Sequence, residues 1–110
     1  MLLNLGEARV RSTNTVDQQA VALLNAVRNR SDATTTFTVA GFANAAALLS
    51  AIMTERRIEF LGEGLRNNDL MRLLQPIPAK GAAGAKTPAD DGYIWPASAT
   101  EKSLNKLWVD

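Results

Sequence analysis

Residues 54–72 read TERRIEFLGEGLRNNDLMR, and a segment with apolar residues at helical spacing precedes them. That spacing predicts a long helix over residues 43–63. The glycines of the GEG sequence then end the helix, because glycine readily adopts the left-handed conformation found at helix ends. A shorter helix follows over residues 66–74 and stops before Pro76. The stretch therefore predicts two consecutive helices joined by a glycine turn.

The long helix has a plausible start and one apolar face. Asn44 precedes it and is of the residue type that caps helix N-termini. Its apolar residues share one face and predict a stripe that packs on other helices: Leu48, Leu49, Ile52, Met53 and Phe60. On the short helix the corresponding stripe consists of Leu70, Leu73 and Leu74. Both helices are therefore expected to contribute to a core.

The first 30 residues predict an antiparallel helical hairpin. An apolar segment over residues 1–12 forms one helix, and a polar turn follows it. The second helix is the clearest in the chain, because its apolar residues stand at positions i, i+3, i+4 and i+7, namely Ala20, Leu23, Leu24 and Val27. Thr15 followed by Gln18 fits a capping box at its start.

The remaining segments are predicted to be mostly irregular. Residues 31–41 are rich in Thr and are expected to form a loop. Residues 75–92 contain Pro, Gly, Ala and Lys and predict an exposed loop. One or two helical turns are expected from Ala99 to Leu104. Tyr93 and Trp95 are interpreted as side chains that close the helical layer rather than as sugar-stacking rings, and for Trp108 both interpretations stay open.

Composition excludes several classes of function. The chain has 110 residues, enough for one domain at most. A net charge of +1 does not support nucleic-acid binding through bulk charge. The absence of Cys and His excludes disulfides, cysteine-based zinc sites and Ser-His-Asp triads within the chain. We expect no metal and no cofactor.

Residues 54–72 contain many charged side chains. Glu55, Glu59 and Glu63 are expected on one helical face, where they repel each other unless cations lie against them. We therefore predict a structural network of ion pairs that joins the long helix to the short one and consists of Arg56, Glu59, Glu63, Arg66, Asp69 and Arg72. The alternative is a pair of carboxylates that performs acid–base chemistry, as in glycoside hydrolysis.

The same string resembles the C-terminal part of the SusD/RagB family of nutrient-binding outer-membrane lipoproteins. That family carries the pattern E-R-R-x-E-[LF]-x-x-E-G-x-R-x-x-D-L-x-R. The positions of this chain that match the pattern are Glu55, Arg56, Arg57, Glu59, Phe60, Glu63, Gly64, Arg66, Asp69, Leu70 and Arg72.

Three further stretches resemble the family. Residues 3–9 are similar to its L-x-x-A-E-A helix, with Gly6 where Ala is usual, and residues 22–30 are similar to its L-N-x-V-R-x-R helix. Ile94-Trp95-Pro96 with residues 101–105 resembles its closing W-P-I-P-x-x-E-x-x-x-N region. Ser98 stands in place of the second Pro of that pattern.

The resemblance implies an all-α fold with a tetratricopeptide-like hairpin in residues 1–30, a long and a short helix in residues 43–74, and an irregular region in residues 75–110. It implies one segment, residues 1–110, at the C-terminal end of a longer lipoprotein on the surface of a Gram-negative bacterium. Such proteins bind glycans or other nutrients beside a SusC-like TonB-dependent transporter and are not enzymes. The ligand-stacking aromatic residues of the family lie mostly upstream, so no ligand-binding residue is assigned.

Two competing interpretations remain. The chain could be a free-standing helical adaptor that binds a peptide or protein partner in a groove. Such an adaptor needs a capped first helix, and no capping residue precedes the first apolar residues here. A small carboxylate enzyme is the other alternative, in which Glu59→Gln or Glu63→Gln abolishes turnover and leaves stability intact.

Overall fold

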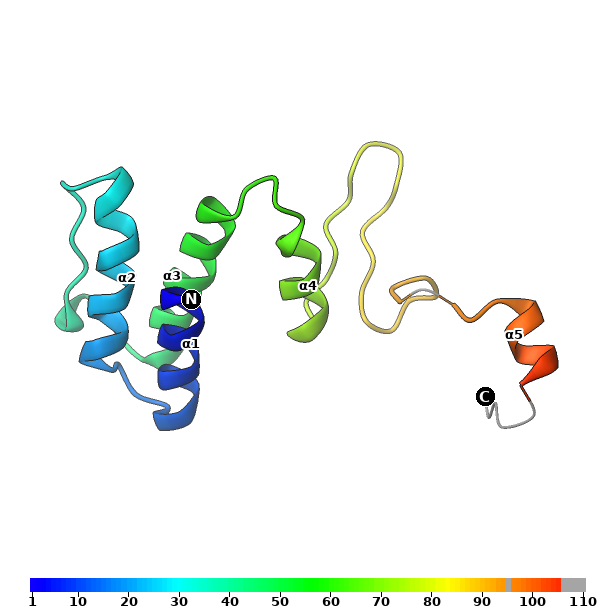
Figure 1. Cartoon of the computed structure of the whole chain (residues 1–110), viewed down its shortest axis with the longest axis horizontal. Helices are drawn as coiled ribbons and strands as arrows, with labels where there is room; N and C mark the ends of the chain where they lie inside the picture. Colours follow the sequence, from blue (N-terminus) through cyan, green and yellow to red (C-terminus); the bar gives the residue numbers. More distant parts are fainter. Residues whose placement is uncertain (95, 106–110) are drawn as a thin grey trace. The chain divides into compact units, whose positions relative to one another are not determined.

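The computed structural model describes residues 1–94 and 96–105 of the chain. All regular elements in these residues are helices, so the all-α prediction is confirmed: α1 (Leu2–Thr13), α2 (Gln18–Ser31), the 3-10 helix η1 (Val39–Gly41), α3 (Ala45–Glu59), α4 (Leu65–Arg72) and α5 (Ala99–Leu104) (Figure 1). The chain divides into two compact units, residues 1–63 and residues 64–110.

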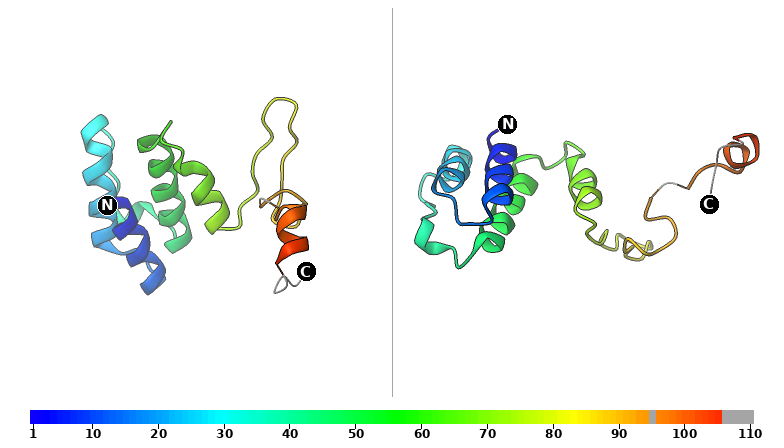
Figure 2. Two further views of the ribbon diagram at one scale, coloured as in Figure 1. Left: turned by 45° about the vertical axis from the view of Figure 1, so that its right-hand side comes forward. Right: turned by 90° about the horizontal axis from the view of Figure 1, so that it is seen from below.

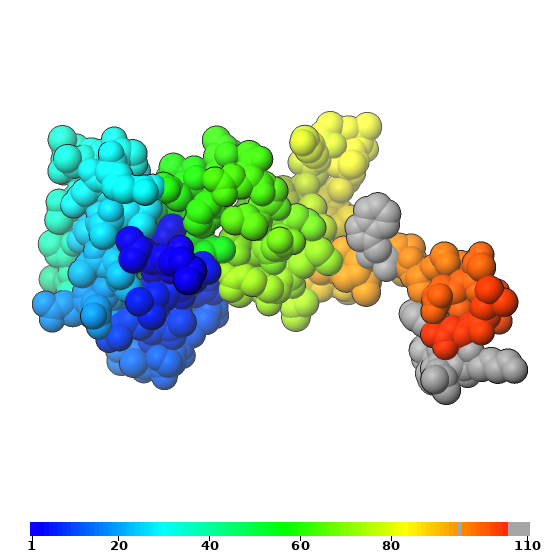
Figure 3. All heavy atoms as spheres, in the orientation of Figure 1, coloured from blue at the N-terminus to red at the C-terminus, as the bar shows by residue number. Residues whose placement is uncertain are grey.

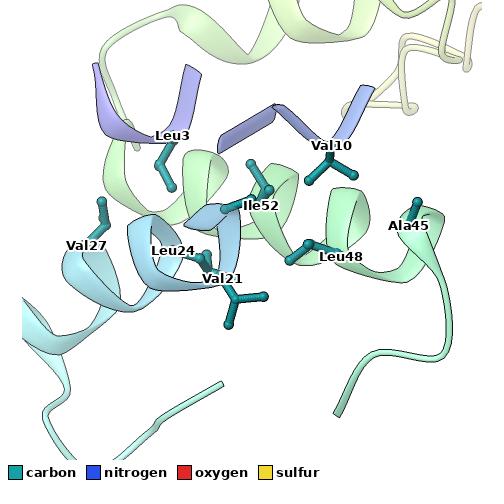
Figure 4. Close-up of a cluster of buried hydrophobic side chains, with 9 residues drawn as sticks. Leu3, Val10, Val21, Leu24, Val27, Ala45, Leu48 and Ile52 are labelled. Carbon is teal, nitrogen blue, oxygen red and sulfur yellow. The ribbon is translucent and has the colours of Figure 1, made fainter. Parts of the chain in front are cut away.

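The first unit consists of three packed helices. α1 and α2 run antiparallel, and α3 packs against both (Figures 1 and 2). Asn14 ends α1 in the left-handed conformation, with φ of 52°, and so turns the chain toward α2. Figure 4 shows the buried side chains that the three helices contribute to one core, and the members of that core are Leu3, Val10, Ala20, Val21, Leu24, Val27, Ala45, Leu48 and Ile52.

Of the two predicted helix caps, the structure confirms the one at α3 and contradicts the one at α2. Asn44 caps α3, because its side chain accepts a hydrogen bond from the Ala47 N–H at 2.9 Å. Thr15 does not cap α2. That helix begins at Gln18, and Asp17 caps it by accepting a hydrogen bond from the Ala20 N–H at 2.7 Å.

Asp17 also joins the two helices of the hairpin. Arg9 of α1 donates to both of its carboxylate oxygens, at 3.0 and 3.1 Å. The hydrogen bond from Arg9, and after it the one from the Ala20 N–H, lower the pKa of Asp17 below its ordinary value. Asp17 therefore both caps α2 and links that helix to Arg9 of α1.

α3 ends at Glu59, four residues before the end of the helix predicted over residues 43–63. After it, Leu61 N–H donates to the Ile58 carbonyl in a tighter turn. Gly62 and Gly64 then adopt positive φ angles of 87° and 75°, which take the chain off the helical path. Glu63 consequently does not share a helical face with Glu55 and Glu59.

The short helix α4 also ends earlier than expected. Its last residue is Arg72, and Leu74 has a positive φ of 49°. Leu70 is buried, but Leu74 is exposed. The predicted apolar stripe of this helix was therefore wrong at Leu74, because that residue lies beyond the helix end.

An asparagine of α2 binds the backbone of the loop between α2 and α3. Asn25 accepts a hydrogen bond from the Phe37 N–H and donates to the Phe37 carbonyl, both at 2.8 Å. The Phe37 ring lies 5.8 Å from the Phe42 ring, measured between centroids, and both rings pack against the core. As predicted, residues 31–41 contain no strand. Residues 32–38 form the loop, whereas Ser31 ends α2 and residues 39–41 form η1.

In the second unit, residues 75–92 are largely exposed and form a loop with two isolated backbone bridges, Ile77 with Lys86 and Lys80 with Ala83. Tyr93 closes the base of this loop. Its buried hydroxyl donates to the Gln75 carbonyl at 2.8 Å, and the Leu70 carbonyl lies 3.3 Å away. This hydrogen bond at the base of the loop differs from the predicted role of Tyr93 in closing the helical layer, which stays a prediction. The interpretations of Trp95 and Trp108 concern positions outside the described residues.

Candidate functional site

Two pairs of charged residues of the first unit meet where α2 and α3 end. Glu55 is 1% exposed, because it continues the buried face of Leu48 and Ile52 on α3. Arg28 of α2 lies against it, with 2.9 Å between Arg28 Nη2 and Glu55 Oε2. A carboxylate this deeply buried needs such a cation, since an unpaired buried charge is very costly.

The pair between Arg28 and Glu55 is only partly satisfied. Arg28 Nε and Glu55 Oε1 are both buried, and neither has a hydrogen-bond partner among the described residues. The contact between Arg28 Nη2 and Glu55 Oε2 is therefore the interaction that offsets the desolvation free energy of the buried Glu55 carboxylate.

One helical turn further along α3, Glu59 forms an ion pair with Arg30 of α2. This pair is nearer to the solvent, since the side chains of Arg30 and Glu59 are 66% and 28% exposed. The last two turns of α3 are thus connected to the end of α2 by two successive Arg–Glu pairs.

Arg56 points inward, as its position on α3 predicts. It is buried, its guanidinium lies 5.5 Å from the centroid of the Phe60 ring, and it donates a hydrogen bond to the side chain of Asn4 on α1. Arg56 therefore connects α3 to α1, while Arg28 and Arg30 connect α3 to α2.

In the second unit, Asp69 is buried and accepts hydrogen bonds from Arg72 one turn later on α4, at 2.9 Å from Nε and 2.8 Å from Nη2. Glu63 and Arg66 are exposed, and neither forms an ion pair within the part of the chain that the structure describes. The structure thus pairs Asp69 with Arg72 and Glu59 with Arg30. The six-residue network as a whole stays a prediction.

Arg28 and Arg30 are the two cations of this cluster that the sequence analysis did not select as partners of the glutamates. A signal for Arg28 exists in the sequence. It follows Leu24 by four residues and so continues the apolar stripe of its helix, just as Glu55 continues the stripe of α3. Two oppositely charged residues that extend two packed stripes are natural partners.

These contacts limit the chemistry of the site. No group of three or more acidic residues in residues 1–94 and 96–105 is arranged to hold a metal ion. Glu55, Glu59 and Asp69 each form an ion pair with an arginine of the same unit, so each of these carboxylates already has a partner within the protein. None of the described helices is long and apolar enough to cross a membrane.

Comparison with known proteins identifies the family. The model of the SusD family matches residues 1–107, which is almost the whole chain. Neither the curated proteins nor the solved structures contain a match. The matched residues include the Glu–Arg string from α3 to α4 and the hairpin of α1 and α2. The chain therefore belongs to the SusD family.

Proposed function

We propose that this chain is a segment of a cell-surface protein that binds glycans or other nutrients without transforming them. The observation that carries this proposal is the family match over residues 1–107, because the SusD family is a family of binding proteins. The segment acts as a helical scaffold, and the ligand is held through upstream parts of the complete protein.

The contacts of the acidic residues support a role without catalysis. A glycoside hydrolase needs one carboxyl group that can donate a proton and a second that stays ionised. Here Glu55 is buried against Arg28, and Glu59 is paired with Arg30. Both carboxylates therefore serve as partners of arginines that join α2 to α3, which supports a structural role for them.

The proposal extends to location and partners. The complete protein is a lipoprotein of the outer membrane of a Gram-negative bacterium, held there by a lipid on a cysteine that lies outside this chain. It works with a SusC-like TonB-dependent transporter, which receives the bound nutrient. The antiparallel pair α1 and α2 corresponds to the last tetratricopeptide-like hairpin of the scaffold. No cofactor is required for any of these steps.

Affinity electrophoresis tests the proposal. The complete natural gene product and the 110-residue chain are run through native gels that contain one polysaccharide each, from a panel of plant, fungal and host glycans. We expect at least one polysaccharide to retard the complete protein, and none to retard the chain alone. Failure of the whole panel to retard the complete protein contradicts glycan binding.

A further inference from the structure

Asp91 and Gly92 form a tight turn where the loop of residues 75–92 ends. The Tyr93 N–H donates to the Asp90 carbonyl at 3.1 Å and closes the turn around the two residues between them. Gly92 has a φ angle of 80°, as the third residue of a type II turn requires. Asp91 and Gly92 are both exposed, and the loop lies at the surface of the second unit, in yellow and orange in Figure 3.

Two neighbouring groups of this turn can react with each other. The Asp91 carboxylate and the Gly92 N–H form no hydrogen bond or ion pair with the residues that the structure describes. A Cβ added at Gly92 would have no other atom within 4 Å, so the space around this residue is open. Because glycine has no side chain, nothing shields its nitrogen from the preceding carboxyl group.

We propose that Asp91 is a site of spontaneous conversion to isoaspartate. After the carboxylate takes up a proton from water, the Gly92 nitrogen forms a bond to Asp91 Cγ. The hydrogen of that nitrogen leaves with a carboxyl OH group as water, and a five-membered succinimide ring results. A second water molecule then breaks the ring bond between the nitrogen and the main-chain carbonyl carbon. Gly92 stays attached through the Asp91 side chain, and the new main-chain carboxyl releases the proton.

Lys86 is a positioning residue that slows this ring closure. The Gly92 nitrogen reaches Asp91 Cγ only when the ψ angle of Asp91 rotates away from about 120°, the value of a type II turn. That rotation moves the Asp91 carbonyl oxygen. The same oxygen accepts a hydrogen bond from Lys86 Nζ at 2.8 Å, and this bond must break before the ring can form.

The conversion opens the base of the loop. Isoaspartate adds one methylene group to the backbone, which lengthens the turn by about 1.5 Å. The turn bond between Asp90 and Tyr93 is then lost, and the Tyr93 hydroxyl moves away from the Gln75 carbonyl that it binds. We therefore expect faster hydrogen exchange at the Ile77 amide in the isoaspartate form. This inference does not depend on glycan binding.

The test incubates the complete natural gene product at neutral pH and body temperature for several weeks. Isoaspartate has the same mass as aspartate, so chromatography separates the tryptic peptides and electron-transfer fragmentation locates the modified residue. Asp90 is the internal control. It is exposed in the same loop, but its carboxylate accepts hydrogen bonds from the Thr87 N–H and hydroxyl, at 2.7 and 2.8 Å. We expect isoaspartate to accumulate several-fold faster at Asp91 than at Asp90.

Two variants test the role of the lysine. Lys86→Met should speed the conversion by a factor on the order of two to ten, the effect of losing one hydrogen bond. Lys80→Met changes another exposed lysine of the loop and should leave the rate unchanged. Asp91→Glu should stop the reaction, since its longer side chain would have to close a six-membered ring.

Three results would each overturn part of the proposal. Equal amounts of isoaspartate at Asp91 and Asp90, or none at either, would exclude Asp91 as a preferred site. Equal rates for Lys86→Met and Lys80→Met would exclude the restraint by Lys86. Unchanged hydrogen exchange at the Ile77 amide in the chromatographically separated isoaspartate form would exclude the opening of the loop.

Discussion

Arg28 on α2 contacts Glu55 on α3 across 2.9 Å, and Glu55 is the most deeply buried charged residue that the structure describes. The two residues are 27 positions apart in the sequence but extend the apolar stripes of two packed helices. The Arg30–Glu59 pair, one turn further along α3, joins the ends of the same two helices.

Arg28→Met should destabilise the chain by about 3 kcal/mol, because it leaves the Glu55 carboxylate buried without a cation. Urea denaturation followed by circular dichroism measures the change. The double variant Arg28→Met/Glu55→Met should recover most of the loss, since it removes the buried charge as well. Arg57→Met is the matched control and should change stability by less than about 0.5 kcal/mol. Equal losses for Arg28→Met and Arg57→Met would show that the pair has no structural role.

Gly6→Ala should stabilise the chain by roughly 0.5–1 kcal/mol. Gly6 lies inside α1, where glycine costs more conformational entropy than alanine. An added Cβ would lie 3.7 Å from Ile52 Cδ1 and 3.8 Å from the Ala20 carbonyl oxygen, which are ordinary van der Waals distances. A rise in the midpoint of thermal unfolding tests the prediction. A fall of the midpoint would mean that α1 and α2 approach too closely for a methyl group.

Asp32 is expected to make a pH-dependent contribution to the free energy of unfolding. The hydroxyls of Thr34 and Thr35, together with the Thr34 N–H, lower the pKa of this carboxyl from 3.8 to about 2. The folded state therefore favours the ionised form, and the stabilisation is fully present above the unfolded pKa and lost as the pH falls through about 2.

Asp32→Asn should accordingly destabilise the chain at neutral pH, and the difference from the unmodified chain should shrink as the pH falls from about 4 to about 2. Denaturation series at several pH values measure this difference. Asp91→Asn, at another exposed aspartate, serves as the control. A difference that is constant across the pH range would exclude the hydrogen bonds of Asp32 as its cause.

Tyr93→Phe should loosen the loop of residues 75–92, because it removes the hydroxyl that donates to the Gln75 carbonyl. One lost hydrogen bond of about 1 kcal/mol corresponds to roughly fivefold faster opening. Hydrogen exchange at the bridged amides of Ile77 and Lys86 should increase by this factor. Amides in the core of α2 provide the internal control, and unchanged exchange at Ile77 would contradict the closing role of Tyr93.

Periodicity in the sequence predicts most of the helices, because apolar spacing and helix breakers act locally. The start of α3 after Asn44 is an example. The predicted cap of α2 was wrong because Thr15 and Asp17 are both of residue types that cap helices. Asp17, which caps the helix, also contacts Arg9 of α1, and this contact arises only in the folded hairpin. The early end of α3 was missed because the tighter turn after Glu59 begins before the first glycine.

The candidate site was harder to predict than the helices. Sequence reasoning sought the partners of the glutamates among the arginines of the same string. The structure instead supplies Arg28 for Glu55 and Arg30 for Glu59, both from a helix distant in sequence. Periodicity shows which residues face the core, but it does not show which helix lies opposite, so the partner of a buried charge depends on tertiary packing.

We propose that the complete protein binds a glycan and leaves it intact. The most direct measurement incubates the complete natural gene product with the polysaccharide that retards it in a gel and follows new reducing ends over time. We expect bound polysaccharide and no new reducing ends. Release of reducing ends that Glu59→Gln or Glu63→Gln abolishes, with stability unchanged, would contradict it.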